Sequence, residues 1–278
     1  MVQLEKSEVS LKLNRSISLV KKILSYIIRK LRLVDPADFI YQRRLELSQE
    51  LNTLHKSKVA YGPLTGLKLT NDEWWGSTSR ASMLLGFYEK EVLDSLGDIP
   101  SKYSMFVDVG AADGYYGVGL VVAEFFQNSI CYEIAQKGQE AIRKNALLNN
   151  VSERVTIRGA VEKEFYKDFS EDELKRSVFF FDIEGVEFDI LNRDSLLELK
   201  DAIIFIESHA LFFKDGKDKE KKLIKLAKEF FEVSIITTCS RDLSEFKELS
   251  HYSDTDRWLI CSEGRGELMN WLRLDPKN

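Results

Sequence analysis

Residues 105–120 read MFVDVGAADGYYGVGL, and this stretch decides the fold class. An apolar run that contains one acid, Met105–Val109, is followed by Gly110, Gly114 and Gly117. Glycine allows the backbone to turn sharply and to approach a ligand without a side-chain clash. The apolar pattern then resumes with helical character. The stretch therefore predicts a buried strand, a ligand-binding turn and a helix, in that order.

The turn is not the dinucleotide-binding pattern Gly-x-Gly-x-x-Gly, because Ala111 and Ala112 follow Gly110. Asp108 precedes the turn, and a carboxylate there disfavours a pyrophosphate and favours a cationic ligand. S-adenosylmethionine is such a ligand, since it carries a sulfonium and an ammonium group. Glu133 ends the next strand, where an acid can accept hydrogen bonds from both ribose hydroxyls. An ordinary tight turn followed by a helix-capping acid is the alternative.

Beyond Tyr103, where the core of the domain is expected to begin, apolar strand patterns alternate with helical patterns. Such alternation predicts an α/β fold with a mostly parallel sheet and helices on both faces. Two strands, EVSIITT at 232–238 and RWLICSE at 257–263, are expected to close the sheet with an antiparallel C-terminal strand. In such sheets ligands bind outside the carboxyl ends of the strands. The residues directly after each strand are therefore the candidates for function.

The N-terminal region, residues 1–60, is expected to form a helical extension of a domain that spans residues 61–278. Within residues 11–34, apolar residues recur at helical spacing, and other positions carry seven Lys and Arg and no acid. This helix packs on the domain, binds a partner, or lies peripherally on the inner face of an anionic membrane. A second helix is expected to begin at Pro36.

Charge and cysteine content bear on partners and compartment. The formal net charge of −5 gives no general attraction to nucleic acid, whose phosphates require a basic surface. The three cysteines, Cys131, Cys239 and Cys261, lie beside apolar runs and are expected to be buried, reduced thiols. The first ten residues are polar and acidic, unlike a signal peptide. We therefore expect a cytoplasmic protein with no nucleic-acid partner.

Four ionisable residues follow two of the predicted strands. Asp182 and Glu184 come after a run of three phenylalanines, and Glu207 and His209 end the pattern IFIESH. Because parallel strands end at one edge of a sheet, the four groups could meet in one cleft. His209 is the candidate general base, since its ordinary pKa is about 6.5. The alternatives are a capping network with a solvated His209, or a divalent metal, not our prediction, held by Asp182, Glu184 and Glu207.

Several stretches together resemble the FkbM-type family of S-adenosylmethionine-dependent methyltransferases. They are FVDVGAADGYYGVG, CYE, KNALLNN, FFDIEGVEFDIL and IFIESH, and the resemblance covers roughly residues 84–210. It implies a Rossmann-like class I methyltransferase sheet. It also implies methylation of a hydroxyl group on a sugar, a glycan or a small natural product. Where that family usually has Asn, this chain has Ala112.

The resemblance also implies roles for individual residues. The turn would contact the methionine part of the cofactor through Asp108, Gly110 and Gly114, and Glu133 would bind the ribose. The strand-end residues near the transferred methyl group would be Asp182, Glu184 and His209, with Asp182 also facing the cofactor. Further cofactor contacts are expected from the rest of the turn and from one small residue after the third strand: Ala111, Asp113, Tyr115, Tyr116 and Ala160.

Two other function classes fit parts of the pattern. Nucleic-acid methyltransferases that modify amino groups have Asn or Asp, two prolines and an aromatic residue after the fourth strand. This chain has DIEG at 182–185, with no proline. A module without catalysis would use the same cleft to bind S-adenosylmethionine or another nucleotide, and a nicotinamide-dependent enzyme is a further option. We predict an enzyme with a small-molecule or glycan acceptor.

Overall fold

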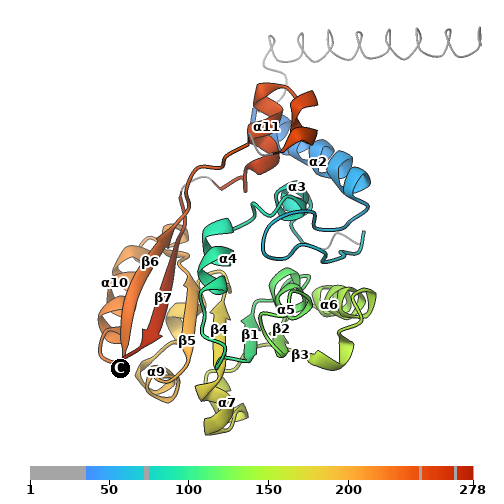
Figure 1. Cartoon of the computed structure of the whole chain (residues 1–278). Coiled ribbons are helices and arrows are strands. Elements are labelled where there is room, and N and C mark those ends of the chain that lie inside the picture. Colours follow the sequence, from blue (N-terminus) through green and yellow to red (C-terminus); the bar gives the residue numbers. More distant parts are fainter. Residues whose placement is uncertain (1–35, 72–74, 244–245, 266–267, 278) are drawn as a thin grey trace, which may run out of the picture.

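The computed structural model describes residues 36–71, 75–243, 246–265 and 268–277. At their centre lies a seven-stranded sheet with the order β3-β2-β1-β4-β5-β7-β6 (Figure 1). The strands are β1 (Met105–Val109), β2 (Asn128–Tyr132), β3 (Val155–Arg158), β4 (Ser177–Phe181), β5 (Ile203–Glu207), β6 (Phe231–Thr237) and β7 (Asn270–Pro276). β1 to β5 pair in parallel, and β7 runs antiparallel to both its neighbours. The predicted Rossmann-like sheet, mostly parallel with an antiparallel C-terminal strand, is confirmed.

Helices cover both faces of the sheet, as predicted. One face carries α4 (Lys90–Gly97), α5 (Tyr115–Val122) and α6 (Gln136–Leu148). The other carries α7 (Glu171–Lys175), α8 (Glu187–Ile190), α9 (Arg193–Glu198) and α10 (Gly216–Ala227). β4 lies between the two cores, which explains why its sequence is apolar throughout after Ser177. Phe180 packs against Tyr116 and Trp271 on the first face, while Phe179 and Phe181 face the second.

A helical layer stands beyond the carboxyl ends of the parallel strands (Figure 1). It consists of α2 (Pro36–His55), α3 (Arg80–Leu84) and α11 (Asp254–Cys261), and α2 packs against both of the others. Leu47 and Ile260 are among the buried residues of its own apolar core. The predicted start of a helix at Pro36 is confirmed. The basic stretch 11–34 lies outside the described residues.

Asn145 of α6 ties the segment between α2 and α3 to the glycine turn, and Asn149, directly after α6, holds the same segment. Asn145 accepts a hydrogen bond from the N–H of Thr70 at 2.8 Å and donates to the carbonyl of Asp113 at 2.8 Å. Asn149 bonds the N–H and the carbonyl of Lys68 at 2.9 and 2.7 Å. Short 3-10 turns join the remaining elements: η1 (Ser77–Ser79), η2 (Ser152–Arg154), η3 (Phe165–Asp168), η4 (Ala210–Phe212) and η5 (Lys247–His251).

The C-terminal part of the chain departs from prediction in two respects. Most of RWLICSE, at 257–263, lies in the helix α11 and not in a strand. Ser253 caps this helix by accepting a hydrogen bond from the N–H of Asp256 at 3.1 Å, and Asp254 adds negative charge to its first turn. The C-terminal strand is β7 instead. Cys239 is exposed, because it follows the edge strand β6, whereas the other two thiols are buried.

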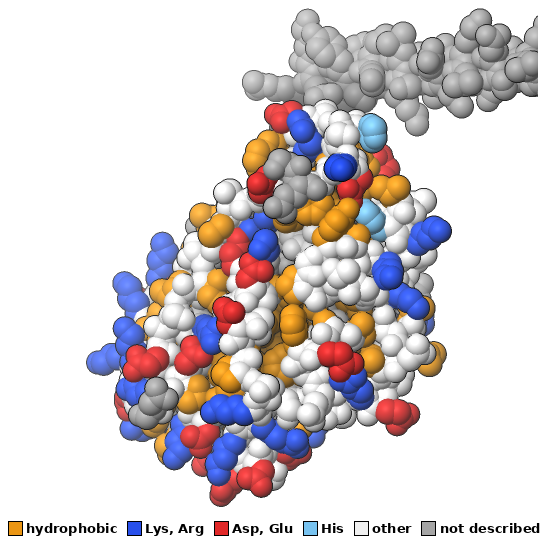
Figure 2. Space-filling model, in the orientation of Figure 1, with side chains coloured by type: hydrophobic (Ala, Val, Ile, Leu, Met, Phe, Trp, Pro, Cys, Tyr) orange, Lys and Arg blue, Asp and Glu red, His pale blue; other side chains and the backbone are white. Residues whose placement is uncertain are grey.

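The surface carries charges of both signs. Figure 2 shows Lys and Arg gathered along the α10 edge, with acidic side chains interspersed over the rest of that face. Among the described helices, none is long and apolar enough to cross a bilayer.

Gly110 is the position where the fold tolerates a side chain least. Its φ is +94°, and an added Cβ would stand 1.8 Å from the carbonyl oxygen of Asp182. We predict that Gly110→Ala lowers the free energy of unfolding by about 2 kcal/mol or more, because the ends of β1 and β4 must separate. Gly97→Ala is the matched control, since nothing lies within 4 Å of a Cβ there. Urea unfolding measures both, and equal stability of the two variants would contradict the prediction.

Candidate functional site

Two cavities meet at the carboxyl ends of the strands. The glycine-turn pocket, of about 440 Å³, has walls that include Gly110, Ala112, Glu133, Ile134, Ala160 and Ile183. The acidic pocket, of about 640 Å³, has walls that include Tyr88, Glu207, His209, Phe212, Glu263 and Arg265. Trp75, Asp182 and Glu184 line both cavities. A molecule in one pocket would therefore lie next to a molecule in the other at these three side chains.

Glu133 is fixed beside the glycine turn by backbone N–H groups. Its Oε2 accepts from the N–H of Ala112 at 2.9 Å, and its Oε1 accepts from the N–H of Ala135 at 2.7 Å. Gly138 makes room for it, because an added Cβ there would lie 2.6 Å from Glu133 Cγ. Each carboxylate oxygen has a second lone pair. Glu133 can therefore accept further hydrogen bonds from a ligand in the glycine-turn pocket.

Ala112 stands where the resembled family usually has Asn. Its φ of +48° lies in the left-handed region, which Asn adopts more readily than most other residues with a side chain. The hydrogen bond from its N–H to Glu133 holds the same backbone shape here. This conformation favours Asn at the position, and Ala112 adopts it without an amide side chain.

The acids at the end of β1 and in the turn point into the protein. Asp108 is buried, and its Oδ2 accepts from the N–H of Gly117 at 2.9 Å. Asp113 faces the buried Arg80, with 3.7 Å between Oδ2 and Nη2. Burial raises the pKa of Asp108 to about 7 and the pKa of Asp113 above its usual value. Neither acid lines the glycine-turn pocket, so their contacts with a cofactor stay predictions.

The two tyrosines after the turn are buried at the start of α5. Tyr115 donates to the carbonyl of Met83 at 3.4 Å, and Tyr116 donates to Glu89 at 2.6 Å. Like Ala111 and Gly114, they do not line the pocket, and their cofactor contacts stay predictions. The predicted cofactor-binding residues that do line it are Gly110, Glu133, Ala160 and Asp182, and Glu184, predicted near the transferred methyl group, lines it as well.

His209 lies among four acids in what we call the acidic cluster: Asp182, Glu184, Glu187, Glu207 and His209. Its Nε2 is 3.4 Å from Asp182 Oδ1, 3.5 Å from Glu207 Oε2 and 3.6 Å from Glu184 Oε2. Its Nδ1 is 3.2 Å from Glu187 Oε1. Burial, and then the charge of Glu207, raises the pKa of Asp182 well above its usual value. The structure thus brings together the four groups predicted after β4 and β5.

Glu187 belongs to the cluster but was not predicted from the sequence. It is completely buried, and it accepts from the N–H of Gly185 at 2.8 Å and from the N–H of His209 at 3.3 Å. The sequence feature that marks Glu187 is its position inside the largely apolar stretch GVEFDIL, where a buried carboxylate needs hydrogen-bond partners. Glu187 therefore fixes both the backbone and the ring of His209.

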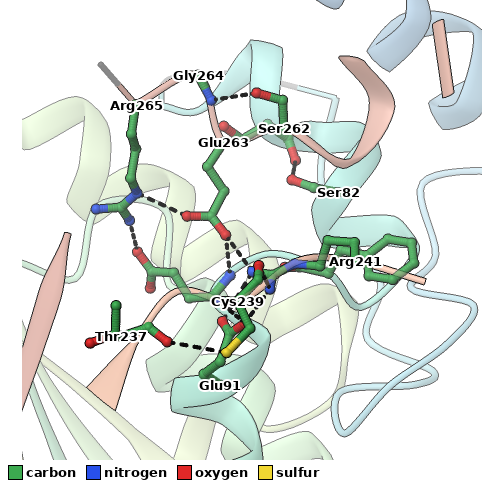
Figure 3. A network of polar contacts seen from close by, with 12 residues as sticks. Ser82, Glu91, Thr237, Cys239, Arg241, Ser262, Glu263, Gly264 and Arg265 are labelled. Atoms are coloured by element: carbon green, nitrogen blue, oxygen red, sulfur yellow. Dashed lines mark hydrogen bonds and ion pairs between the residues drawn. The ribbon is translucent and has the colours of Figure 1, made fainter. Parts of the chain in front are cut away.

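Arg265 reaches the acidic pocket from the segment between β6 and β7. It pairs with Glu207 and Glu89, and it also donates to Glu263 at 2.8 Å. Glu263 in turn accepts from Arg241 at 3.0 Å, and Arg241 pairs with an acid of α4 (Figure 3). No sequence pattern marks Arg265 or Glu89, because the partners lie 176 residues apart. Each of the three acids Glu89, Glu207 and Glu263 thus has an arginine as a neighbour.

Asp108 makes the stability of the fold depend on pH. The folded protein holds its proton up to about pH 7, whereas an unfolded chain releases it near pH 3.9. The stability from this group is therefore complete below about pH 4 and is lost as the pH rises to about 7, by about 4 kcal/mol in total. We predict that Asp108→Asn gains roughly 3 kcal/mol relative to wild type between pH 5 and pH 8. Urea unfolding measures the difference, and a pH-independent one would contradict this reasoning.

Comparisons with known proteins concern the fold. No protein-family model and no curated protein matches the sequence. Sp1610 of Streptococcus pneumoniae, in complex with S-adenosyl-L-methionine, is similar at 14% identity, over 68% of this chain and 73% of that chain, with TM-score 0.45. The tRNA methyltransferase TrmK of B. subtilis is similar at 8%, over 66% and 65%, with TM-score 0.44. Precorrin-6y C5,15-methyltransferase of Geobacter metallireducens is similar at 13%, over 66% and 85%, with TM-score 0.43. Such distant likenesses carry no argument about activity.

Proposed function

We propose that this chain is an S-adenosylmethionine-dependent methyltransferase whose acceptor is a hydroxyl group of a sugar, a glycan or another small molecule. The observation that carries the proposal is the meeting of two pockets at Trp75, Asp182 and Glu184. Both cavities have the size of small-molecule sites. A methyl donor in the glycine-turn pocket and an acceptor in the acidic pocket would have their reacting atoms at this shared wall.

The glycine-turn pocket has groups that suit this cofactor. Glu133 offers a carboxylate to a ribose, and Ile134 and Ala160 offer apolar surface to a base. Asp182 and Glu184, on the side of the acidic pocket, offer negative charge to a sulfonium. A cationic cofactor therefore gains from acids that would repel a pyrophosphate.

The acidic cluster has groups that suit the reaction. Bound S-adenosylmethionine would supply a methyl group on a positively charged sulfur. As an acceptor oxygen forms its bond to that carbon, the carbon–sulfur bond breaks, its electron pair stays on sulfur, and the hydroxyl proton must leave. In the metal-free protein His209 is the predicted base that takes this proton. Asp182 or Glu184 is predicted to orient either the His209 ring or the acceptor. Alignment of the reactants lowers the activation barrier by about 7–11 kcal/mol. Removal of the proton by a base raises the reaction rate by a factor of about 10²–10⁴.

The charge of the acidic pocket supports a small neutral acceptor over a nucleic acid. Four acids line the cavity, and its cation, Arg265, is already paired with acids. Phosphate groups would be repelled from such a wall. We therefore propose that nucleic acid is not the substrate.

We also propose that the protein is cytoplasmic. The supporting observation is the exposed free thiol of Cys239, which would stay reduced in that compartment. Peripheral membrane contact through residues 11–34 stays a prediction, since that stretch lies outside the described residues.

Glu133→Gln tests the cofactor site. The variant loses the charge that strengthens hydrogen bonds to ribose, a loss of about 1.5–3 kcal/mol, so we expect affinity for S-adenosylhomocysteine to fall about tenfold or more. Isothermal titration calorimetry measures it. Glu140→Gln, an exposed acid on α6, is the control and should bind as the wild type does. Unchanged affinity of Glu133→Gln would refute the ribose assignment, and a wild type that binds neither this compound nor S-adenosylmethionine would refute the proposed function.

Methyl-labelled S-adenosylmethionine tests transfer itself. The protein is incubated with a cell extract separated into small-molecule, glycan and nucleic-acid fractions, and we expect label in the first two. His209→Gln should slow labelling by about 10²-fold or more. Its affinity for S-adenosylhomocysteine should be unchanged, since His209 does not line the glycine-turn pocket. Label in nucleic acid alone would overturn the acceptor class, and full activity of the variant would exclude His209 as the base.

A further inference from the structure

We propose that Asp182, Glu207 and His209 bind a divalent cation, Mn²⁺ or Mg²⁺, at the wall of the acidic pocket. The inference deepens the proposed function, and it rests on that function for the role of the cation but not for its binding. The sequence offered Asp182, Glu184 and Glu207 as an alternative ligand set. The structure replaces Glu184 in that set with His209.

The spacing of the three side chains fits a coordination shell. Each offers one ligand atom, and the three atoms lie within 4.8 Å of one another. His209 Nε2 is 3.4 Å from Asp182 Oδ1 and 3.5 Å from Glu207 Oε2. Metal–ligand bonds of about 2.1–2.3 Å at angles near 90–110° separate neighbouring ligand atoms by roughly 3.0–3.8 Å. The two observed separations lie inside this range.

The second ring nitrogen of His209 provides an independent observation. The side chain is almost completely buried. Among the described residues no hydrogen bond joins Nε2 to an acceptor, although three carboxylate oxygens stand 3.4–3.6 Å away. Because Nδ1 meets the carboxylate of Glu187, a neutral ring carries its lone pair on Nε2, and that lone pair faces carboxylate oxygens. A cation between Nε2 and these oxygens would replace this repulsion with a bond to each ligand atom.

The atoms of His209 and Glu207 that would not bind the cation are held by neighbouring side chains, as is usual for metal ligands. A coordinating histidine commonly bonds a carboxylate through its other nitrogen, which orients the ring. Here Nδ1 of His209 meets the completely buried Glu187 at 3.2 Å. Arg265 pairs with Oε1 of Glu207, and Oε2 is the oxygen that faces His209. The outer contacts therefore direct one atom of each of these two ligands toward the same point.

The charge of the cluster also calls for a cation. Four carboxylates surround one imidazole, and the nearby Arg265 is shared with Glu89 and Glu263. Two carboxylate oxygens and one imidazole nitrogen suit Mn²⁺, and the nitrogen favours it over Mg²⁺. Glu184, at the pocket mouth with its side chain 59% exposed, can add an oxygen.

A cation here would face the cavity that we assign to the acceptor. With protein ligands on one side, positions remain open toward the 640 Å³ pocket. An acceptor hydroxyl bound there would lose its proton more readily, because a divalent cation stabilises the alkoxide. In that state Nε2 is a ligand and cannot accept the proton. The cation would lower the pKa of the hydroxyl, and the proton would pass to the exposed carboxylate of Glu184 or to water in the open pocket.

Mn²⁺ titration of the chelator-treated full chain tests the site. We expect calorimetry to show one bound Mn²⁺, and the sharp electron paramagnetic resonance signal of free Mn²⁺ to fall in step. Asp182→Asn and Glu207→Gln should each weaken binding by about tenfold or more, and Glu187→Gln by about 10–100-fold. Glu171→Gln, with a side chain 91% exposed on α7, is the control and should bind normally. Asp182 is not in the core, so its variant keeps the test valid if Glu207→Gln does not fold.

Two results would overturn the proposal: a wild type that binds neither Mn²⁺ nor Mg²⁺, or an Asp182→Asn variant that binds as tightly as wild type. Titration with S-adenosylhomocysteine on the same samples separates this proposal from the proposed function. Glu133→Gln should lose affinity for that compound and keep its Mn²⁺ site. Mn²⁺ binding without cofactor binding would support the cation site and refute the methyltransferase proposal. Cofactor binding without Mn²⁺ or Mg²⁺ binding would refute the cation site and leave the methyltransferase proposal standing.

Discussion

The contact between Gly110 and the carbonyl of Asp182 is the constraint on which the site depends. An added Cβ would lie 1.8 Å from that oxygen, so no other residue permits the same approach of β1 to β4. On one side of this junction, the N–H of Gly110 bonds the carbonyl of Tyr132, directly before Glu133. On the other side stands Asp182, which belongs to the acidic cluster. The spacing of the two pockets is therefore set by a backbone contact, which cannot relax as a side chain can.

The acids of the site are stable because other parts of the chain reach them. Glu187 holds His209 from the start of α8, and Arg265 comes from the segment that carries α11. Residues of η1, which leads directly into α3, complete the wall of the acidic pocket, Ser77 among them. The helical layer is thus part of the site and not only a cover for the sheet. The glycine-turn pocket, in contrast, is built mostly from the strand ends themselves.

Features that depend on residues close together in the sequence could be predicted, and features that depend on contacts between distant residues could not. The positions of the parallel strands could be predicted from apolar runs and local turns. The meeting of Asp182 with His209 follows from parallel strands that end at one edge. RWLICSE was misread because a short apolar run fits a strand or the last turns of a helix equally well. Arg265 could not be predicted, because only the fold brings it to Glu89. Asp108 and Asp113 were placed in the right turn, but their side chains face inward.

β7 lies between β5 and β6 although it follows both of them in the chain. On the ribosome, β6 therefore emerges with no neighbour to pair with, and β5 waits with one open edge. Trp271 and Leu272, which fill the two cores from β7, arrive later still. Unpaired edges of this kind invite association between nascent chains. This strand order therefore leaves both edges open until β7 can enter between them.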